Sequence, residues 1–207
     1  TKEEIRIRKN TIESAGLKWS VVESVPVHEN IKTRSGDFRR NIENYKTTLE
    51  NLASEGIHIV CYNFMPILDW TRTELAWTLP NGAKALRFEK KEVVAFDLFM
   101  LKRKGAEKEY TPQDIQKAKE FYENASEETL KRVNDNILKG LPGSEEGYTM
   151  EQFQAALDSY QGIGHAELER NLQFFLDAVL PVAEKNGVKM AIHPDDPPFD
   201  VFGLPRV

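Results

Sequence analysis

The sequence predicts an α/β fold in which helices alternate with parallel strands. Three apolar segments of strand type each follow a helical pattern, and a glycine separates the two elements every time. The pairs are 3–15 with 17–23, 37–54 with 57–62, and 164–186 with 188–193. This alternation is typical of a parallel sheet with right-handed crossovers. The order of elements alone does not choose between an open sheet and a barrel.

The composition is that of a globular chain with enough apolar residues for one substantial core. Of its 207 residues, 40% are hydrophobic and 29% are charged. The net charge of −5 argues against nucleic acid as a partner, because phosphate binding needs a concentrated basic face. The run Lys102-Arg103-Lys104 is interpreted as a solvated helix end, since acidic residues follow it. No apolar run is long enough to span a membrane.

Cysteine usage predicts a cytoplasmic location. With Cys61 as the single cysteine, no internal disulfide is possible, and a reducing compartment follows as the expectation. No secretory leader opens the chain. Because the sequence starts without methionine and already in a helical pattern, we expect it to be an internal segment of a longer protein.

The first two helices and the second strand have clear hydrophobic patterns. Gly16 is placed to stop the first helix. Apolar residues at steps of three and four give the second helix a buried stripe. These residues are Phe38, Ile42, Tyr45, Leu49 and Leu52. The nearly all-apolar run 57–62 predicts a strand buried on both faces, and 24–35 is predicted to be a polar loop.

A mostly helical insertion is predicted for residues 74–163. Asn81-Gly82 between the apolar runs 74–79 and 83–88 is a strong hairpin signal, because both turn positions need positive φ. Helices are then expected over 89–100 and from three capping signals onward. These signals are Thr111-Pro112, Ser126 and the capping box Thr149/Gln152. The portion 140–147 is the loosest stretch. Beyond the insertion, Pro181 is expected to kink the helix 164–186 near Asp177.

Each predicted strand ends in polar residues, and parallel strands deliver such residues to one edge of a sheet, where ligands bind in α/β folds. The first strand supplies Glu23 and then His28, and the second supplies Asn63, followed by Asp69, Trp70 and Arg72. The third supplies His193, Asp195 and Asp196, held among three prolines. Three strands with polar ends are a stronger signal than any one of them.

Each candidate has a functional and a structural interpretation. His193 could be a metal ligand, since neutral imidazole is a common ligand of transition metals, or a histidine that hydrogen-bonds a loop. Asp195 and Asp196 could serve as ligand, hydrogen-bond partner or general base, or form a solvated turn. Arg72 with Trp70 could bind a carboxylate and a polyol, or Arg72 could pair with Asp69.

Other polar residues look structural. His58 is expected to be a satisfied core group, His165 a helix-opening residue and Cys61 a small apolar filler, while Tyr62 is ambiguous. The sequence contains no glycine-rich phosphate loop, no Gly-x-Ser-x-Gly elbow and no zinc-finger spacing. Nucleotide kinases, Rossmann dehydrogenases and serine hydrolases are therefore not first choices.

Three motifs resemble the mannonate dehydratase family of the metal-dependent, xylose-isomerase-like barrel type. The first is the run 190–198, Met-Ala-Ile-His-Pro-Asp-Asp-Pro-Pro, with Gly203-Leu204-Pro205-Arg206. The second is 61–66, Cys-Tyr-Asn-Phe-Met-Pro, with 69–73, Asp-Trp-Thr-Arg-Thr. The third is Leu141-Pro142-Gly143 with 145–148, Glu-Glu-Gly-Tyr. The resemblance covers essentially the whole chain.

The resemblance implies that the chain is part of a (β/α)8 TIM barrel, a single partial domain over 1–207 that carries the insertion 74–163. It implies dehydration of D-mannonate to 2-keto-3-deoxy-D-gluconate in glucuronate breakdown, with Mn2+ or Fe2+ as cofactor, in a homodimer. His193 matches the family's metal ligand. The other ligands (Cys, His and Asp) and the proton-transfer His and Tyr would lie beyond Val207, and Cys61 is not the family's ligand cysteine.

The resemblance also suggests that Trp70, Arg72, Asn63, Asp195, Asp196 and His28 contact the sugar acid. Two alternatives remain open at this point. One is a related metal-dependent sugar isomerase or epimerase on the same barrel, which would keep the substrate's formula. The other is a non-catalytic fragment that binds sugar acids without turnover.

Overall fold

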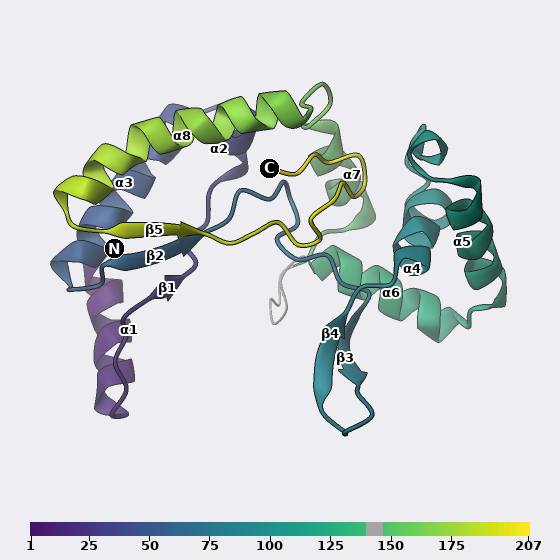
Figure 1. Ribbon diagram of the computed structural model, residues 1–207, viewed down its shortest axis with the longest axis horizontal. Coiled ribbons are helices and arrows are strands. Elements are labelled where there is room, and N and C mark those ends of the chain that lie inside the picture. The colour runs from purple at the N-terminus through teal and green to yellow at the C-terminus, as the bar shows by residue number, and fades with distance from the viewer. Residues whose placement is uncertain (140–146) are drawn as a thin grey trace. The chain divides into compact units, whose positions relative to one another are not determined.

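The computed structural model describes residues 1–139 and 147–207, and Figure 1 shows its ribbon. The chain forms two compact units, which are described separately. The first comprises Thr1–Pro66, Ile163–Asp195 and Arg206–Val207, and the second comprises Ile67–Gly162 and Asp196–Pro205. The predicted insertion 74–163 falls in the second unit except for its last residue. That unit also contains segments on either side of the insertion in the sequence.

The first unit is a three-stranded parallel sheet with its connecting helices. Its helices are α1 (Lys2–Ser14), α2 (Glu29–Thr33), α3 (Phe38–Ser54) and α8 (His165–Lys185). Its strands are β1 (Val22–Glu23), β2 (Ile59–Tyr62) and β5 (Lys189–Ile192), in the spatial order β1-β2-β5. Both pairings are parallel, with Val22 opposite Val60 and Cys61 opposite Ala191. The predicted alternation of helices and parallel strands is confirmed.

Helices α3 and α8 cover the same face of this sheet (Figure 1). The ring of Phe175 on α8 packs edge-on against Tyr45 of α3, with centroids 5.0 Å apart, and lies 6.0 Å from Tyr62 of β2. The stripe predicted for α3 is buried here, since Leu49 is 0% exposed. Apolar residues at helical spacing thus bring both helices onto one side of the strands.

The other face of the sheet is open in the described part of the chain. Ile59 is 39% exposed, and its neighbour across the sheet, Lys189, is also exposed. The expectation that 57–62 is buried on both faces is therefore wrong for this chain. His58 is also exposed and precedes β2, so its predicted core position is wrong. The first strand is shorter than predicted, because only Val22–Glu23 of 17–23 pair.

The predicted polar loop at 24–35 contains the short helix α2. His28 caps its start, because the ring Nδ1 accepts a hydrogen bond from the Asn30 amide at 3.0 Å. Ile31 and Lys32 of α2 are almost fully buried. The Lys32 ammonium donates to the Met65 carbonyl at 2.7 Å and to Glu29 at 2.6 Å. Its hydrogen bond to Met65 fixes α2 to the segment that follows β2.

The second unit contains the predicted hairpin and a group of helices. The hairpin strands are β3 (Glu74–Thr78) and β4 (Lys84–Arg87), which pair antiparallel. The helices are α4 (Lys90–Ala95), the π-helix η1 (Phe96–Leu101), the 3-10 helix η2 (Ala106–Glu109), α5 (Pro112–Asn124), α6 (Glu127–Lys139) and α7 (Met150–Asp158). The Thr111 cap and the Thr149/Gln152 capping box are confirmed. The loose stretch predicted at 140–147 lies outside the described residues, except Gly147.

Aromatic packing fastens the segment after β5 to this unit. Phe202 lies edge-on to Phe96 and Phe153, with ring centroids 5.7 Å and 5.4 Å apart. All three side chains are nearly fully buried. Segment 196–205 is therefore an integral part of the second unit's core, although nearly forty positions separate it from α7 in the sequence.

Arg103 corrects the interpretation of the basic run 102–104. Its guanidinium binds Asp97 through Nε at 2.9 Å and Nη2 at 2.8 Å, and it also binds Glu109 at 2.7 Å. Asp97 is 0% exposed and accepts a further bond from the Tyr110 hydroxyl at 2.6 Å. Burial, and then the Asp97 charge, raise the pKa of Tyr110. The middle residue of the run is therefore a structural ion-pair partner.

Candidate active site

His193 stands directly at the carboxyl end of β5. Its backbone amide donates to the Tyr62 carbonyl at 2.7 Å and so extends the β2–β5 pairing by one position. The ring Nδ1 lies 2.7 Å from the Pro194 carbonyl oxygen. A carbonyl only accepts, so Nδ1 carries the proton and Nε2 carries the lone pair in the neutral ring. This is the tautomer of a histidine that binds a metal through Nε2, with its other nitrogen held by a carbonyl.

Asp195 is buried in the first unit near His193. It is 8% exposed, and its Oδ2 accepts a hydrogen bond from the Val207 amide at 2.8 Å. Its Oδ1 is buried and has no hydrogen-bond partner. Burial raises the pKa of Asp195 above its ordinary value, against the opposing effects of the Val207 bond and the nearby charges of Arg206 and Lys32. The unsatisfied Oδ1 is an acceptor that a hydroxyl donor could use.

Asp196 belongs to the second unit, where it forms an ion pair with Arg72. Arg72 Nη1 donates to Asp196 Oδ1 at 3.1 Å, and Nη2 donates to Oδ2. Trp70 also forms an isolated parallel bridge with Asp196. Arg72 donates in addition to the Thr71 carbonyl at 2.9 Å. The structural alternative for Arg72 named Asp69 as its partner, and the observed partner is Asp196 instead.

The consecutive carboxylates of Asp195 and Asp196 therefore have separate surroundings. The remaining candidates lie in the first unit. Asn63 is buried, and its Oδ1 accepts a hydrogen bond from the Met65 amide at 3.3 Å. His28 is exposed and lines a pocket of about 410 Å³ beside β1, together with Ser24 and Tyr45. His165 Nδ1 lies 3.0 Å from the Arg206 carbonyl at the start of α8, in agreement with a structural role.

The side chains that could bind a metal lie apart from one another in residues 1–139 and 147–207. These ranges contain no group of three or more His, Cys, Asp or Glu side chains that could hold a metal ion. Within these ranges, His193 is a candidate for a single metal ligand, through its Nε2. Cys61 has a raised pKa, because of burial and then the Glu23 charge, which disfavours the thiolate that binds metals.

The sequence missed several residues that support these candidates. The burial of Lys32 was not predicted, because residues 24–35 were expected to form a polar loop. Glu29 three positions earlier and the apolar Ile31 are signals of a short helix. Arg132 and Asn136 on α6, which hold the segment before β3, gave no local signal. Part of the third motif, 141–143 and 145–146, lies outside the described residues.

The fold and these candidates define a parallel α/β protein with ionisable groups at the strand ends. A model of the D-mannonate dehydratase (UxuA) family matches residues 1–207. The chain therefore belongs to the D-mannonate dehydratase family. None of the helices in the described ranges is long and apolar enough to cross a lipid bilayer.

Individual relatives agree with the family match. The chain is 55% identical over 205 residues to a mannonate dehydratase of Marinomonas sp. (strain MWYL1), covering 99% of this chain and 52% of that protein. It is 52% identical over 200 residues to one of Chromohalobacter salexigens, covering 97% of this chain and 51% of that protein. The crystal structure of mannonate dehydratase from Streptococcus suis serotype2 superposes with a TM-score of 0.67 at 37% identity, covering 100% of this chain and 45% of that one. The chain thus spans about half the length of these relatives.

Proposed function

We propose that the full-length protein containing this chain removes water from D-mannonate to give 2-keto-3-deoxy-D-gluconate in glucuronate breakdown. The observation that carries the proposal is the 55% identity to a mannonate dehydratase across 99% of this chain. The single cysteine, Cys61, supports a reducing compartment such as the cytoplasm. A homodimer stays a prediction from the family resemblance.

We propose further that the first unit is part of a (β/α)8 barrel. Its strand order β1-β2-β5 runs in one direction without reversal, and α3 and α8 lie on the same face. Doubly wound sheets have helices on both faces, whereas barrel strands carry helices only outside. The exposed face with Ile59 and Lys189 would become the inside of the barrel when further strands complete it.

The proposed cofactor is Mn2+ or Fe2+, held in part by Nε2 of His193. When bound, the cation would supply positive charge beside the substrate oxygens on which negative charge develops as the proton next to the carboxylate leaves. Hydrogen bonding of His193 Nδ1 to Pro194 fixes the ring orientation for such a contact. The other ligands are proposed to come from the half of the relatives that this chain does not cover.

Substrate contacts are proposed for the side chains at the strand ends. Asp195 Oδ1 would accept a hydrogen bond from a sugar hydroxyl, because it is a buried acceptor without a partner. Trp70, Asn63 and His28 are proposed to line the polyol chain. Arg72 and Asp196 would contact the substrate together as an ion pair, since each is the other's partner. This arrangement is favoured over an Arg72 side chain that binds the substrate carboxylate without Asp196.

The test uses the full-length protein, loaded with Mn2+ or Fe2+ and incubated with D-mannonate. Mass spectrometry should show a product lighter than the substrate by one water, with the mass of 2-keto-3-deoxy-D-gluconate. A product of unchanged mass would replace this proposal with a sugar isomerase or epimerase. Saturable binding of D-mannonate without turnover would replace it with a binding protein.

A further inference from the structure

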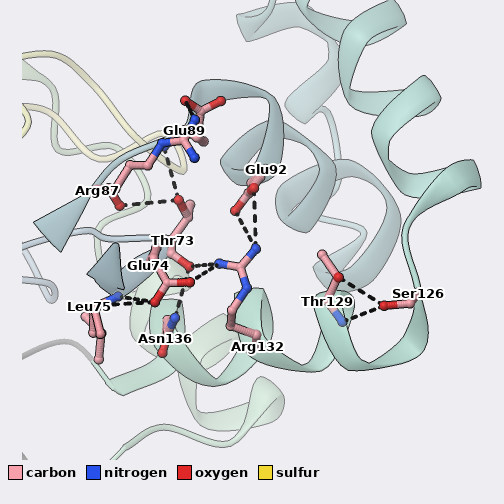
Figure 2. A network of polar contacts seen from close by, with 11 residues as sticks. Thr73, Glu74, Leu75, Arg87, Glu89, Glu92, Ser126, Thr129, Arg132 and Asn136 are labelled. Carbon is pink, nitrogen blue, oxygen red and sulfur yellow. Dashed lines mark hydrogen bonds and ion pairs between the residues drawn. The ribbon is translucent and has the colours of Figure 1, made fainter. Parts of the chain in front are cut away.

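Thr73 is a buried junction between the Arg72 segment and helix α6. Its carbonyl oxygen accepts a hydrogen bond from Asn136 Nδ2 at 2.9 Å and another from Arg132 Nη1, and both donors come from α6 (Figure 2). The residue is 0% exposed. A buried carbonyl with two donors has all of its hydrogen bonds. Displacing the Thr73 carbonyl from α6 would leave the carbonyl and its two donors on α6 without these bonds, which costs free energy.

The other polar groups of Thr73 are also engaged. Its amide donates to the Arg87 carbonyl at 3.0 Å, where β4 ends. Its hydroxyl donates to that same carbonyl at 3.3 Å and accepts the Glu89 amide at 3.1 Å, next to the start of α4. Figure 2 shows these bonds meeting at one residue. The hairpin, α4 and α6 therefore fix the Thr73 backbone from three directions.

Two carboxylates also hold the Arg132 guanidinium in place. Its Nη1 lies 3.3 Å from Glu74 Oε2, and its Nη2 lies 3.3 Å from Glu92 Oε2. Glu92 is 7% exposed, so this is a partly desolvated ion pair. A guanidinium bound by two carboxylates keeps its orientation, because its planar donors have few ways to satisfy both partners.

The Thr73 junction lies one residue from the Arg72–Asp196 ion pair. Arg72 and Thr73 share a planar peptide bond, so hydrogen bonds that constrain the Thr73 backbone also limit the backbone of Arg72. The Thr73 side chain points to Arg87 and Glu89, while Arg72 reaches Asp196. Fixing the backbone at Thr73 therefore fixes the direction in which the Arg72 side chain leaves the chain.

We propose that Arg132 and Asn136 are positioning residues for the Arg72–Asp196 pair and act on substrate binding through it. The inference rests on the proposed function only in assigning that pair to the substrate site. Neither residue would touch the substrate. Their effect on D-mannonate binding should disappear once Arg72 is removed, which a residue that merely stabilises the fold would not show.

The experiment is a double-mutant cycle in the full-length, metal-loaded protein. Asn136→Ala and Arg132→Lys each remove or weaken one donor to the Thr73 carbonyl, and each is measured alone and combined with Arg72→Ala. Each should raise KM for D-mannonate about 3- to 10-fold when Arg72 is present, and by less than about 1.5-fold when it is absent. Equal effects in both backgrounds would overturn the inference.

Lys131→Ala is the matched control. Lys131 lies on α6 next to Arg132, pairs with Asp135 four residues away, and is 74% exposed. Lys131→Ala, like Asn136→Ala, truncates a polar side chain of α6, but one whose ion-pair partner is Asp135. KM should stay unchanged in this variant, and a rise similar to that of Asn136→Ala would overturn the inference by showing that truncation of any polar side chain on α6 has this effect.

Amide hydrogen exchange gives a readout that does not depend on turnover. In Asn136→Ala, peptides covering 70–78 should exchange faster, while peptides covering β2 should keep their rate. Unchanged exchange over 70–78 would contradict the inference even if the wild-type enzyme is active. An inactive wild type would instead defeat the proposed function, and faster exchange over 70–78 would still support the positioning of Arg72.

Discussion

Arg72 binds Asp196 with two nitrogens of its guanidinium, one on each carboxylate oxygen. The two residues are 124 positions apart, and the arginine side chain is 13% exposed against 39% for the aspartate. The arginine is thus the better shielded partner, and it has a further bond to the Thr71 carbonyl. The pair joins the first residue of segment 196–205 to the segment that precedes β3.

Replacing Arg72 by lysine should weaken substrate binding while preserving the charge. An ammonium cannot make the two parallel bonds of the guanidinium, so the Asp196 carboxylate should gain freedom to rotate. We expect KM for D-mannonate to rise about tenfold, as for the loss of roughly 1.4 kcal/mol of binding. Steady-state kinetics of the full-length enzyme give the measurement.

Arg170→Lys is the control for that exchange. Arg170 lies on α8 with a side chain 64% exposed and pairs with Glu167 one helical turn away. Surface pairs of this kind contribute little, so its kinetics should match the wild type. If Arg72→Lys behaves like Arg170→Lys, the ion pair with Asp196 has no part in binding.

Replacing His193 by alanine should lower the metal content of the purified full-length protein. The variant removes the Nε2 lone pair that the Nδ1–Pro194 hydrogen bond defines. Loss of one ligand typically weakens metal binding strongly, and we expect less than about half of the wild-type occupancy after dialysis against a chelator. Elemental analysis by mass spectrometry measures it.

His58→Ala provides a histidine control for metal content. His58 is exposed before β2, at the opposite end of the strand from the His193 partner Tyr62. Its removal should leave the occupancy at the wild-type level. Full occupancy in His193→Ala would rule out the ligand role.

Gly203→Ala should destabilise the protein more than Gly105→Ala. Both glycines have positive φ, +72° and +85°, so alanine costs about 1 kcal/mol at each. At Gly203 an added Cβ would also lie 2.8 Å from Arg103 Nη1, whereas at Gly105 nothing lies within 4 Å. Since Asp97 and Glu109 hold Arg103, we expect a further loss of roughly 1 kcal/mol or more at Gly203.

Urea unfolding of both variants, followed by circular dichroism, measures this difference. Equal losses of unfolding free energy would mean that Arg103 moves aside without cost. A loss at Gly203 alone would mean that the positive φ of Gly105 tolerates a side chain.

Cys61 should react slowly with iodoacetamide near neutral pH. Burial raises the pKa of the thiol, and the Glu23 charge adds to the effect. A raised pKa leaves less thiolate at a given pH. The alkylation rate of Cys61 should therefore still increase at pH values where the rate of a free thiol no longer changes. Mass spectrometry of the folded protein over time, with glutathione as reference, gives the profile. Alkylation at pH 7 as fast as that of glutathione would contradict it.

Local chemistry made much of the fold predictable. Asn81-Gly82 located the hairpin. The expectation that both positions have positive φ was wrong for Asn81, because the loop 80–82 turns with positive φ at Gly82 and not at Asn81. The capping box at Thr149 located the start of α7 as well. Helix stripes and apolar strands likewise depend on nearby spacing, so the parallel α/β order followed from the sequence.

Contacts between distant segments could not be predicted in this way. The partner of Arg72 is 124 residues away, and the sequence offered the nearer Asp69 with equal chemical merit. Arg103 appeared to be a surface charge because nothing in the run 102–104 reveals the buried Asp97. The burial of Lys32 depends on Met65 in the same way. Such residues are defined by three-dimensional neighbours.

The chain passes from the first unit to the second at the peptide bond joining Asp195 to Asp196, one of several such crossings. These adjacent acids therefore have partners in different parts of the chain: Asp195 accepts a hydrogen bond from the Val207 amide, and Asp196 pairs with Arg72. Substitutions within 67–162 can change the contacts of Asp196 without changing the hydrogen bond between Asp195 and Val207. The motif thus joins two carboxylates whose hydrogen-bond partners can be changed separately by substitution.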